Sequence, residues 1–172
     1  PGESNDIRLT LSQPIGEAAS VSSSQPLKLA IRGRWGVRHS LLTFSGDNHD
    51  FEIHGIGLRD GNANAASGIG SAISVFGVGN NVLLSNTRLQ NNYAGLGGAV
   101  FMQDGTLTLR DSYFLNNNAT YAGGAIAVEN VNVIVEDSQF LNNQSARGAA
   151  ISAEVFSASI AHEIKRSIFS NN

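Results

Sequence analysis

A nine-residue segment recurs along this chain at intervals of about 25 residues, and this repeat constrains the fold more than any other feature. Residues 109–117 (LRDSYFLNN) are followed by residues 135–143 (VEDSQFLNN), and weaker copies lie at residues 84–92 and 164–172. A degenerate copy occupies residues 53–61. A repeat of this length is typical of a solenoid, in which each structural unit contacts only its neighbours.

A second motif of four residues alternates with the first. It reads Gly-Ser-Ala-Ile at 70–73, Gly-Gly-Ala-Val at 97–100, Gly-Gly-Ala-Ile at 123–126 and Gly-Ala-Ala-Ile at 148–151. The chain lacks the regularly spaced leucines of a leucine-rich repeat. A unit of this length holds three strands of about four to six residues and three turns. We therefore predict an all-β, right-handed, single-stranded parallel β-helix with about 25 residues per coil and roughly six coils.

The aligned copies predict which side chains share a row along the helix axis. One large inward row consists of Leu58, Leu89, Phe114, Phe140 and Phe169. A second row consists of Asn92, Asn117, Asn143 and Asn172. Stacked asparagines can bond one another's amides and so satisfy polar groups at a buried corner. We also expect Asp111 and Asp137 at bends, because Asp tolerates left-handed backbone.

The repeats and the less regular start of the chain together indicate one continuous domain of 172 residues. We expect residues 1–45 to form an N-terminal cap and the first coil or coils, and residues 46–172 to form the β-helix repeats. The last copy stops at Asn172 without a cap. We therefore expect the remainder of the natural chain, beyond Asn172, to stack on this end as a partner.

Several classes of site are disfavoured by composition and spacing. The chain has no cysteine, and its four histidines show no metal-ligand spacing. Asp111 and Asp137 should stack in adjacent coils, but Asn86 and Arg166 interrupt any acidic column of the kind a polysaccharide-cleaving enzyme needs. We expect no catalytic residue, cofactor or metal. A net charge of −3 disfavours nucleic acid, and no apolar run is long enough to span a membrane.

One basic and aromatic cluster lies near the start of the chain. It consists of Arg32, Arg34, Trp35 and Arg38. These residues form a weak candidate patch for an acidic glycan or a phosphate. The alternative is a long loop between early strands, with Trp35 covering the edge of the core.

The paired tetrapeptides Gly-Gly-Ala-Ile and Phe-x-x-Asn resemble those of the chlamydial polymorphic membrane proteins, over roughly residues 50–172. Those proteins are autotransporter adhesins whose passenger is built from these motifs. The resemblance implies an adhesion role for both motifs. The matching residues are Gly97, Gly98, Ala99, Val100, Phe114, Asn117, Gly123, Gly124, Ala125, Ile126, Phe140, Asn143, Phe169 and Asn172. The same residue types also follow from packing alone, so we expect them to be structural.

Three functional hypotheses follow from the repeat and the resemblance. The first is a segment of a secreted or surface-exposed passenger that binds a host-cell receptor or glycan, placed outside the cell or on the bacterial surface. The second is a fragment of a polysaccharide-active enzyme, and the third is a passive stalk. We favour the first and expect variable outward residues to make the contacts, namely Arg110, Tyr113, Tyr121, Glu129, Gln139 and Arg147.

Overall fold

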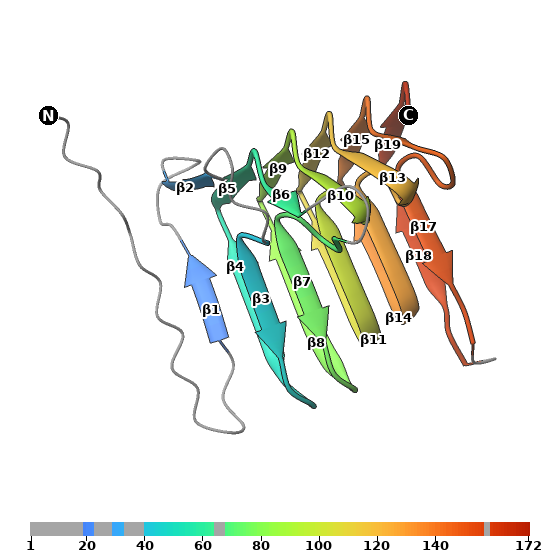
Figure 1. The fold of residues 1–172 in the computed structure, drawn as a ribbon. Helices are drawn as coiled ribbons and strands as arrows, with labels where there is room; N and C mark the ends of the chain where they lie inside the picture. Colours follow the sequence, from blue (N-terminus) through green and yellow to red (C-terminus); the bar gives the residue numbers. More distant parts are fainter. Residues whose placement is uncertain (1–18, 23–28, 33–39, 64–67, 157–158) are drawn as a thin grey trace, which may run out of the picture.

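Short parallel strands stack along one axis around a continuous apolar core (Figure 1). The computed structural model describes residues 19–22, 29–32, 40–63, 68–156 and 159–172. Within these ranges there is no helix, and every strand pairing is parallel. The predicted parallel β-helix is thus confirmed.

The strands form three sheets, each of which gathers one side of successive coils. Sheet A contains β1 (Ala19–Ser22), β3 (Leu42–Ser45), β4 (Asp50–His54), β7 (Ile73–Phe76), β8 (Asn80–Ser85), β11 (Val100–Arg110), β14 (Ile126–Glu136), β17 (Ile151–Glu154) and β18 (His162–Lys165). Sheet B contains β2 (Leu29–Arg32), β5 (Ile56–Arg59), β9 (Arg88–Gln90), β12 (Tyr113–Leu115), β15 (Gln139–Leu141) and β19 (Ile168–Ser170). Sheet C contains β6 (Asn62–Ala63), β10 (Tyr93–Leu96), β13 (Asn118–Ala122) and β16 (Gln144–Ser145).

The number of coils is smaller than predicted. A coil passes through sheet A, then sheet B, then sheet C, and only four coils contribute a strand to all three sheets among the described residues. The prediction of roughly six coils counted the two ends of the chain as full turns. The first turn is represented by β1 and β2 alone, and the last by β17, β18 and β19. Much of the predicted cap over residues 1–45 lies outside the described residues.

The register follows the aligned sequence repeats. Phe114 pairs with Leu89 on one side and with Phe140 on the other, and Phe140 pairs with Phe169. Asparagines that bond across successive coils are 25, 26 and 29 residues apart. The coil length therefore varies while the stacked rows stay aligned, because the extra residues lie between strands or at a local register shift, as within the pairing of β10 with β13.

Strand β11 is longer than the predicted strands of four to six residues. It has 11 residues, and its first part pairs with β7 while its second part pairs with β8. Asp104 lies between the two parts with a φ of 50°. The chain therefore bends at Asp104 without losing its strand pairing, whereas in the preceding coil the same bend separates two strands. Strand β14 repeats this arrangement, with Asn130 at the bend.

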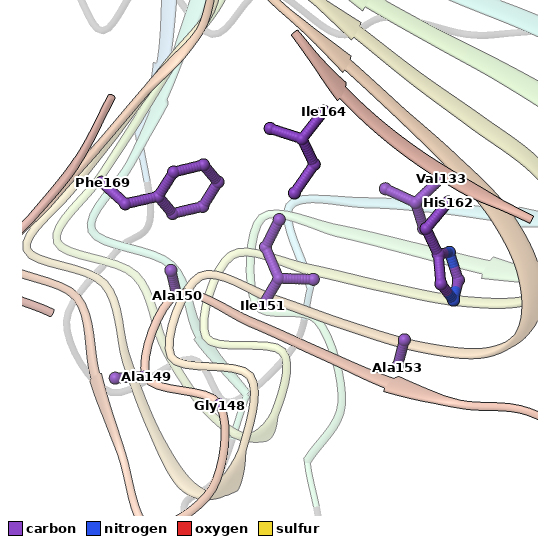
Figure 2. Close-up of a pocket in the computed structure, with 9 residues that line it drawn as sticks. All are labelled: Val133, Gly148, Ala149, Ala150, Ile151, Ala153, His162, Ile164 and Phe169. Atoms are coloured by element: carbon purple, nitrogen blue, oxygen red, sulfur yellow. The ribbon is translucent and has the colours of Figure 1, made fainter. Parts of the chain in front are cut away.

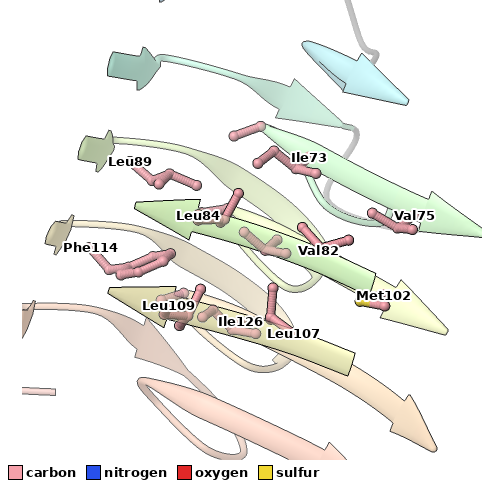
Figure 3. Packing of buried hydrophobic residues seen from close by; sticks show 14 of the residues in the cluster. Ile73, Val75, Val82, Leu84, Leu89, Met102, Leu107, Leu109, Phe114 and Ile126 are labelled. Atoms are coloured by element: carbon pink, nitrogen blue, oxygen red, sulfur yellow. The ribbon is translucent and has the colours of Figure 1, made fainter. Parts of the chain in front are cut away.

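The core lies between the three sheets and is built from rows of aliphatic and aromatic side chains (Figure 3). Ile73, Val100 and Ile126 occupy one row, and all three are fully buried. A narrower row holds Thr87, Ser112 and Ser138, which are also fully buried. Their hydroxyl groups bond to the neighbouring coil or to the local backbone, so this polar row carries no unsatisfied group.

Candidate functional site

The phenylalanines of the Phe-x-x-Asn motif form a stacked column inside the β-helix. The ring centroids of Phe114 and Phe140 are 4.6 Å apart, and those of Phe140 and Phe169 are also 4.6 Å apart. Both pairs are parallel to within 3°. Phe114 and Phe140 have no exposed surface. A ring in this position stabilises the coil but cannot touch a partner protein.

The asparagines of the same motif form a continuous hydrogen-bonded ladder. The side-chain amide of Asn117 donates to Oδ1 of Asn143 at 3.0 Å and to the backbone oxygen of Leu89 at 3.0 Å. Its own Oδ1 accepts from the backbone N–H and the side-chain amide of Asn92. Asn143 likewise donates to the backbone oxygen of Phe114. The spacing from Phe to Asn thus lets each amide bond the backbone oxygen of the residue that holds the Leu or Phe position in the preceding coil.

The first glycine of the second tetrapeptide takes a left-handed backbone conformation at a bend in all four copies, and in the copy at 123–126 the second glycine also lies close to the next coil. Gly123 has a φ of 65°, and a Cβ atom on Gly124 would overlap the backbone oxygen of Ala149 in the next coil. Ala125 and Ile126 point into the core and are fully buried. The predicted structural role of this motif fits these positions. The bend joins sheet C to sheet A, so it determines how the outer faces of the two sheets meet.

A groove of about 310 Å³ lies on the outer side of this bend. It is lined by Leu96, Phe101, Tyr121, Ala122, Ala127, Val128, Glu129, Arg147, Ser152 and Glu154. One wall comes from sheet C and the residues that follow it, and the other comes from β11, β14 and β17. We name this surface the bend groove. Unlike the motif residues, it faces outward and can receive a ligand.

Small side chains keep the bend groove open in its middle coils. Phe101, Ala127 and Ser152 occupy one outward row in three successive coils. The Phe101 ring is only 2% exposed and lies 6.0 Å from the ring of Phe76, so it fills the corner in its own coil. Ala127 and Ser152 leave the corner empty in the next two coils. The groove therefore begins at Phe101 and opens toward the C-terminal coils.

Polar and charged groups stand on both sides of the bend groove. Tyr121 is 47% exposed, and Arg147 is exposed on the same wall. On the opposite wall Glu129 pairs in register with Glu154, and Gln103 donates a 2.7 Å hydrogen bond to Oε2 of Glu129. Sequence reasoning identified Tyr121, Glu129 and Arg147 as outward residues. It missed Phe101 and Glu154, whose outward positions follow from the alternation of inward and outward side chains along β11 and β17.

The paired carboxylates considered as an enzymatic site have a turn role. Asp111 and Asp137 both have positive φ angles, 48° and 49°, as expected for bend positions. Arg166 donates two hydrogen bonds of 2.7 Å to the carboxylate of Asp137. This bond and the charge of Arg166 hold the pKa of Asp137 below its usual value. Asp137 is therefore an ionised surface partner of Arg166.

Two other sequence candidates add no defined site. In the described ranges, no three His, Asp or Glu side chains lie close enough to hold a metal ion. Arg34, Trp35 and Arg38 of the basic and aromatic cluster lie outside the described residues. Arg32 ends β2 and pairs with Arg59 through the backbone. The structure thus leaves this candidate patch as a prediction.

A second hollow, of about 360 Å³, lies at the C-terminal end of the stack (Figure 2). Its lining continues the core rows: Phe169 follows Phe140, and Ile164 follows Val135. Phe169 was expected to be buried in its ladder, but it is 41% exposed, because no coil lies over its outer face in the structure. This hollow is the open end of the core rather than a shaped ligand pocket.

One stretch of the coiled chain matches a known sequence repeat. Residues 111–129 match the repeat of the Chlamydia polymorphic membrane proteins. This chain carries repeats of the polymorphic-membrane-protein type on a parallel β-helix. No match was found among curated proteins or among solved structures. Among the described residues, no helix has the length and apolar character needed to cross a membrane.

The matched polymorphic-membrane-protein repeat covers both kinds of residue discussed above. It contains a complete Phe-x-x-Asn motif at 114–117 and a complete Gly-Gly-Ala-Ile motif at 123–126, and all of their motif side chains point inward or form the bend. It also contains Tyr121 and Glu129, which line the bend groove. One repeat therefore supplies a section of scaffold together with a section of groove.

Proposed function

We propose that this chain is a segment of a surface-exposed passenger that attaches to host cells through the bend groove. The polymorphic-membrane-protein repeat supports a position outside the cell, on the bacterial surface, reached by the autotransporter route. A rigid stack of coils suits such a passenger, because it presents side chains at fixed spacing far from the membrane. The partner in this proposal is a host-cell receptor or a glycan, and adhesion would be the contribution to virulence.

One observation carries this proposal: the motif side chains are buried, and different side chains form the exposed groove. The side chains of Phe114, Asn117 and Ile126 are fully buried, so they have no area to offer a receptor. Tyr121 and Arg147, in contrast, are exposed on the wall of a concave surface. Concave surfaces with an aromatic side chain and a few polar groups are typical of binding sites. The motifs would then act on adhesion indirectly, by holding the groove walls in place.

We also propose that the chain is not an enzyme and that further coils of the natural protein cover its open end. The first part is supported by the turn role of Asp111 and by the pairing of Asp137 with Arg166. The second is supported by the apolar lining of the end hollow, where Ile164 and Phe169 continue the core rows without a neighbour above them. Burial of these side chains would add hydrophobic stabilisation to the end of the stack.

Replacing Tyr121 and Arg147 together by alanine should abolish attachment to cultured animal cells without unfolding the protein. Both side chains are exposed, so their loss should shift the melting temperature by no more than about 2 °C. We expect attachment, measured by flow cytometry with fluorescently labelled protein, to fall by about tenfold or more, which corresponds to about 1.4 kcal/mol.

The matched control replaces Tyr113 and Arg110 by alanine, two of the outward residues expected from the sequence to make contacts that the groove proposal leaves outside the contact surface. These residues have the same side-chain types and are also exposed, but they lie at the junction of sheets A and B, away from the bend groove. The control should bind as the unmodified protein does. Equal loss in both variants would contradict the groove as the contact surface, and no binding by the unmodified protein would favour a passive stalk.

A further inference from the structure

The charges of the bend groove indicate the chemistry of its occupant. Glu129 and Glu154 lie directly opposite each other on neighbouring strands, where the strand spacing is about 4.8 Å. Like charges in directly opposed positions destabilise a sheet. A cation placed between the two carboxylates would remove this repulsion and gain two charge-assisted hydrogen bonds.

The protein itself does not supply such a cation at this place. Glu129 accepts one hydrogen bond, from the neutral amide of Gln103. In the described part of the chain, the Glu154 carboxylate makes no hydrogen bond or ion pair, and the Arg147 guanidinium lies on the other wall without an ion pair. Two carboxylates elsewhere on the surface do have cationic partners: Glu136 pairs with Arg110, and Asp137 pairs with Arg166. The two groove carboxylates therefore remain available for an external group.

The shape of the bend groove and its other lining residues favour one class of cationic ligand. The groove runs along the coil axis past Ala127 and Ser152, so it can hold an extended chain rather than an isolated ion. Its apolar floor includes Ala122 and Ala127. Tyr121 offers a half-exposed ring, on which a guanidinium group can stack. Arg147 can bond a carbonyl oxygen of the same ligand.

We propose that the bend groove binds an extended basic peptide segment of a partner protein, with one arginine seated between Glu129 and Glu154 and packed against Tyr121. This inference rests on the proposed function, which it deepens by naming the class of partner. It commits to a protein partner rather than a glycan, because a neutral or acidic glycan would not neutralise the two opposed carboxylates.

The experiment titrates isotope-labelled protein with the peptide acetyl-Gly-Arg-Gly-Arg-Gly-amide and follows the backbone amides by NMR. We expect saturable shifts confined to the groove strands β13, β14 and β17. The same peptide with glutamine or glutamate in place of arginine should give no saturable shift. The double variant Glu129→Gln with Glu154→Gln should weaken binding by about tenfold or more while the melting temperature stays the same or rises.

The control variant is Asp111→Asn, which also removes a carboxylate but lies outside the groove. Asparagine accepts the positive φ of this position, so the fold is retained. This variant should change the affinity by less than about twofold. Equal weakening in the control, binding of the glutamine or glutamate peptide, or shifts outside the groove would overturn the proposal. If groove variants lose cell attachment but no arginine peptide binds, the proposed function stands and this inference fails.

Discussion

Phe140→Ala should lower the free energy of unfolding by about 3–5 kcal/mol, the usual cost of removing a buried phenylalanine. The Phe140 ring lies between two parallel rings at 4.6 Å, so its loss removes contacts on both faces and leaves a gap in the column. The neighbouring coils cannot collapse into this gap, because the backbone ladders of β12, β15 and β19 hold them apart.

Urea denaturation followed by far-ultraviolet circular dichroism measures this effect. Tyr113→Ala provides the control, because it removes an aromatic ring from the neighbouring strand β12, where the side chain is 44% exposed. This control should cost less than about 1 kcal/mol. A Phe140→Ala protein that unfolds at the same urea concentration as the Tyr113→Ala protein would show that the phenylalanine column does not hold the coils together.

Asn117→Ala should destabilise the protein by about 3 kcal/mol or more, although it removes no large apolar group. The substitution removes four buried hydrogen bonds, which Asn117 makes with Leu89, Asn92 and Asn143, and it leaves the buried backbone N–H of Asn92 without a partner. A buried hydrogen bond contributes about 0.5–1.5 kcal/mol. Each buried polar group without a partner costs about 1–3 kcal/mol. We expect the same urea experiment to show the loss, and hydrogen exchange to show faster opening of the amide of Asn92.

The adjacent Asn116 provides a sharp control for Asn117. Asn116 is exposed and has a φ of 53°, so Asn116→Gly keeps the backbone conformation and breaks no buried hydrogen bond. We expect a change within about 0.5 kcal/mol. If both variants lose stability equally, the buried ladder contributes no more than an exposed turn residue does, and the structural interpretation of the motif is wrong.

The sequence predicted the inward rows because a repeated coil must place like residues above one another. The pairing of Phe114 with Phe140 follows directly from alignment of the copies. The buried amide of Asn80 was not predicted, since it bonds to the backbone of Gly46 and Phe76 in a way that no other coil repeats among the described residues. The exposure of Phe169 was also missed, because a repeat pattern does not say which coil lacks a neighbour.

The bend groove could be predicted only in part. Sequence reasoning identified Tyr121, Glu129 and Arg147 as outward residues. It does not say that the outer faces of sheets A and C meet in a concave corner, because that depends on the angle set by Gly123 and its neighbours. Nor does it distinguish Phe101, which fills the corner, from Ala127, which leaves it open.

In the proposed function, the motifs build the scaffold and the outward groove makes the contact. Phe114→Leu tests this claim most directly, because it destroys a Phe-x-x-Asn motif at a row that already holds leucine in Leu58 and Leu89. The measurement is attachment of this variant to cultured cells, at a temperature where circular dichroism shows it fully folded. We predict attachment equal to that of the unmodified protein. A fully folded Phe114→Leu protein that no longer attaches would contradict the claim and make the motif itself the contact.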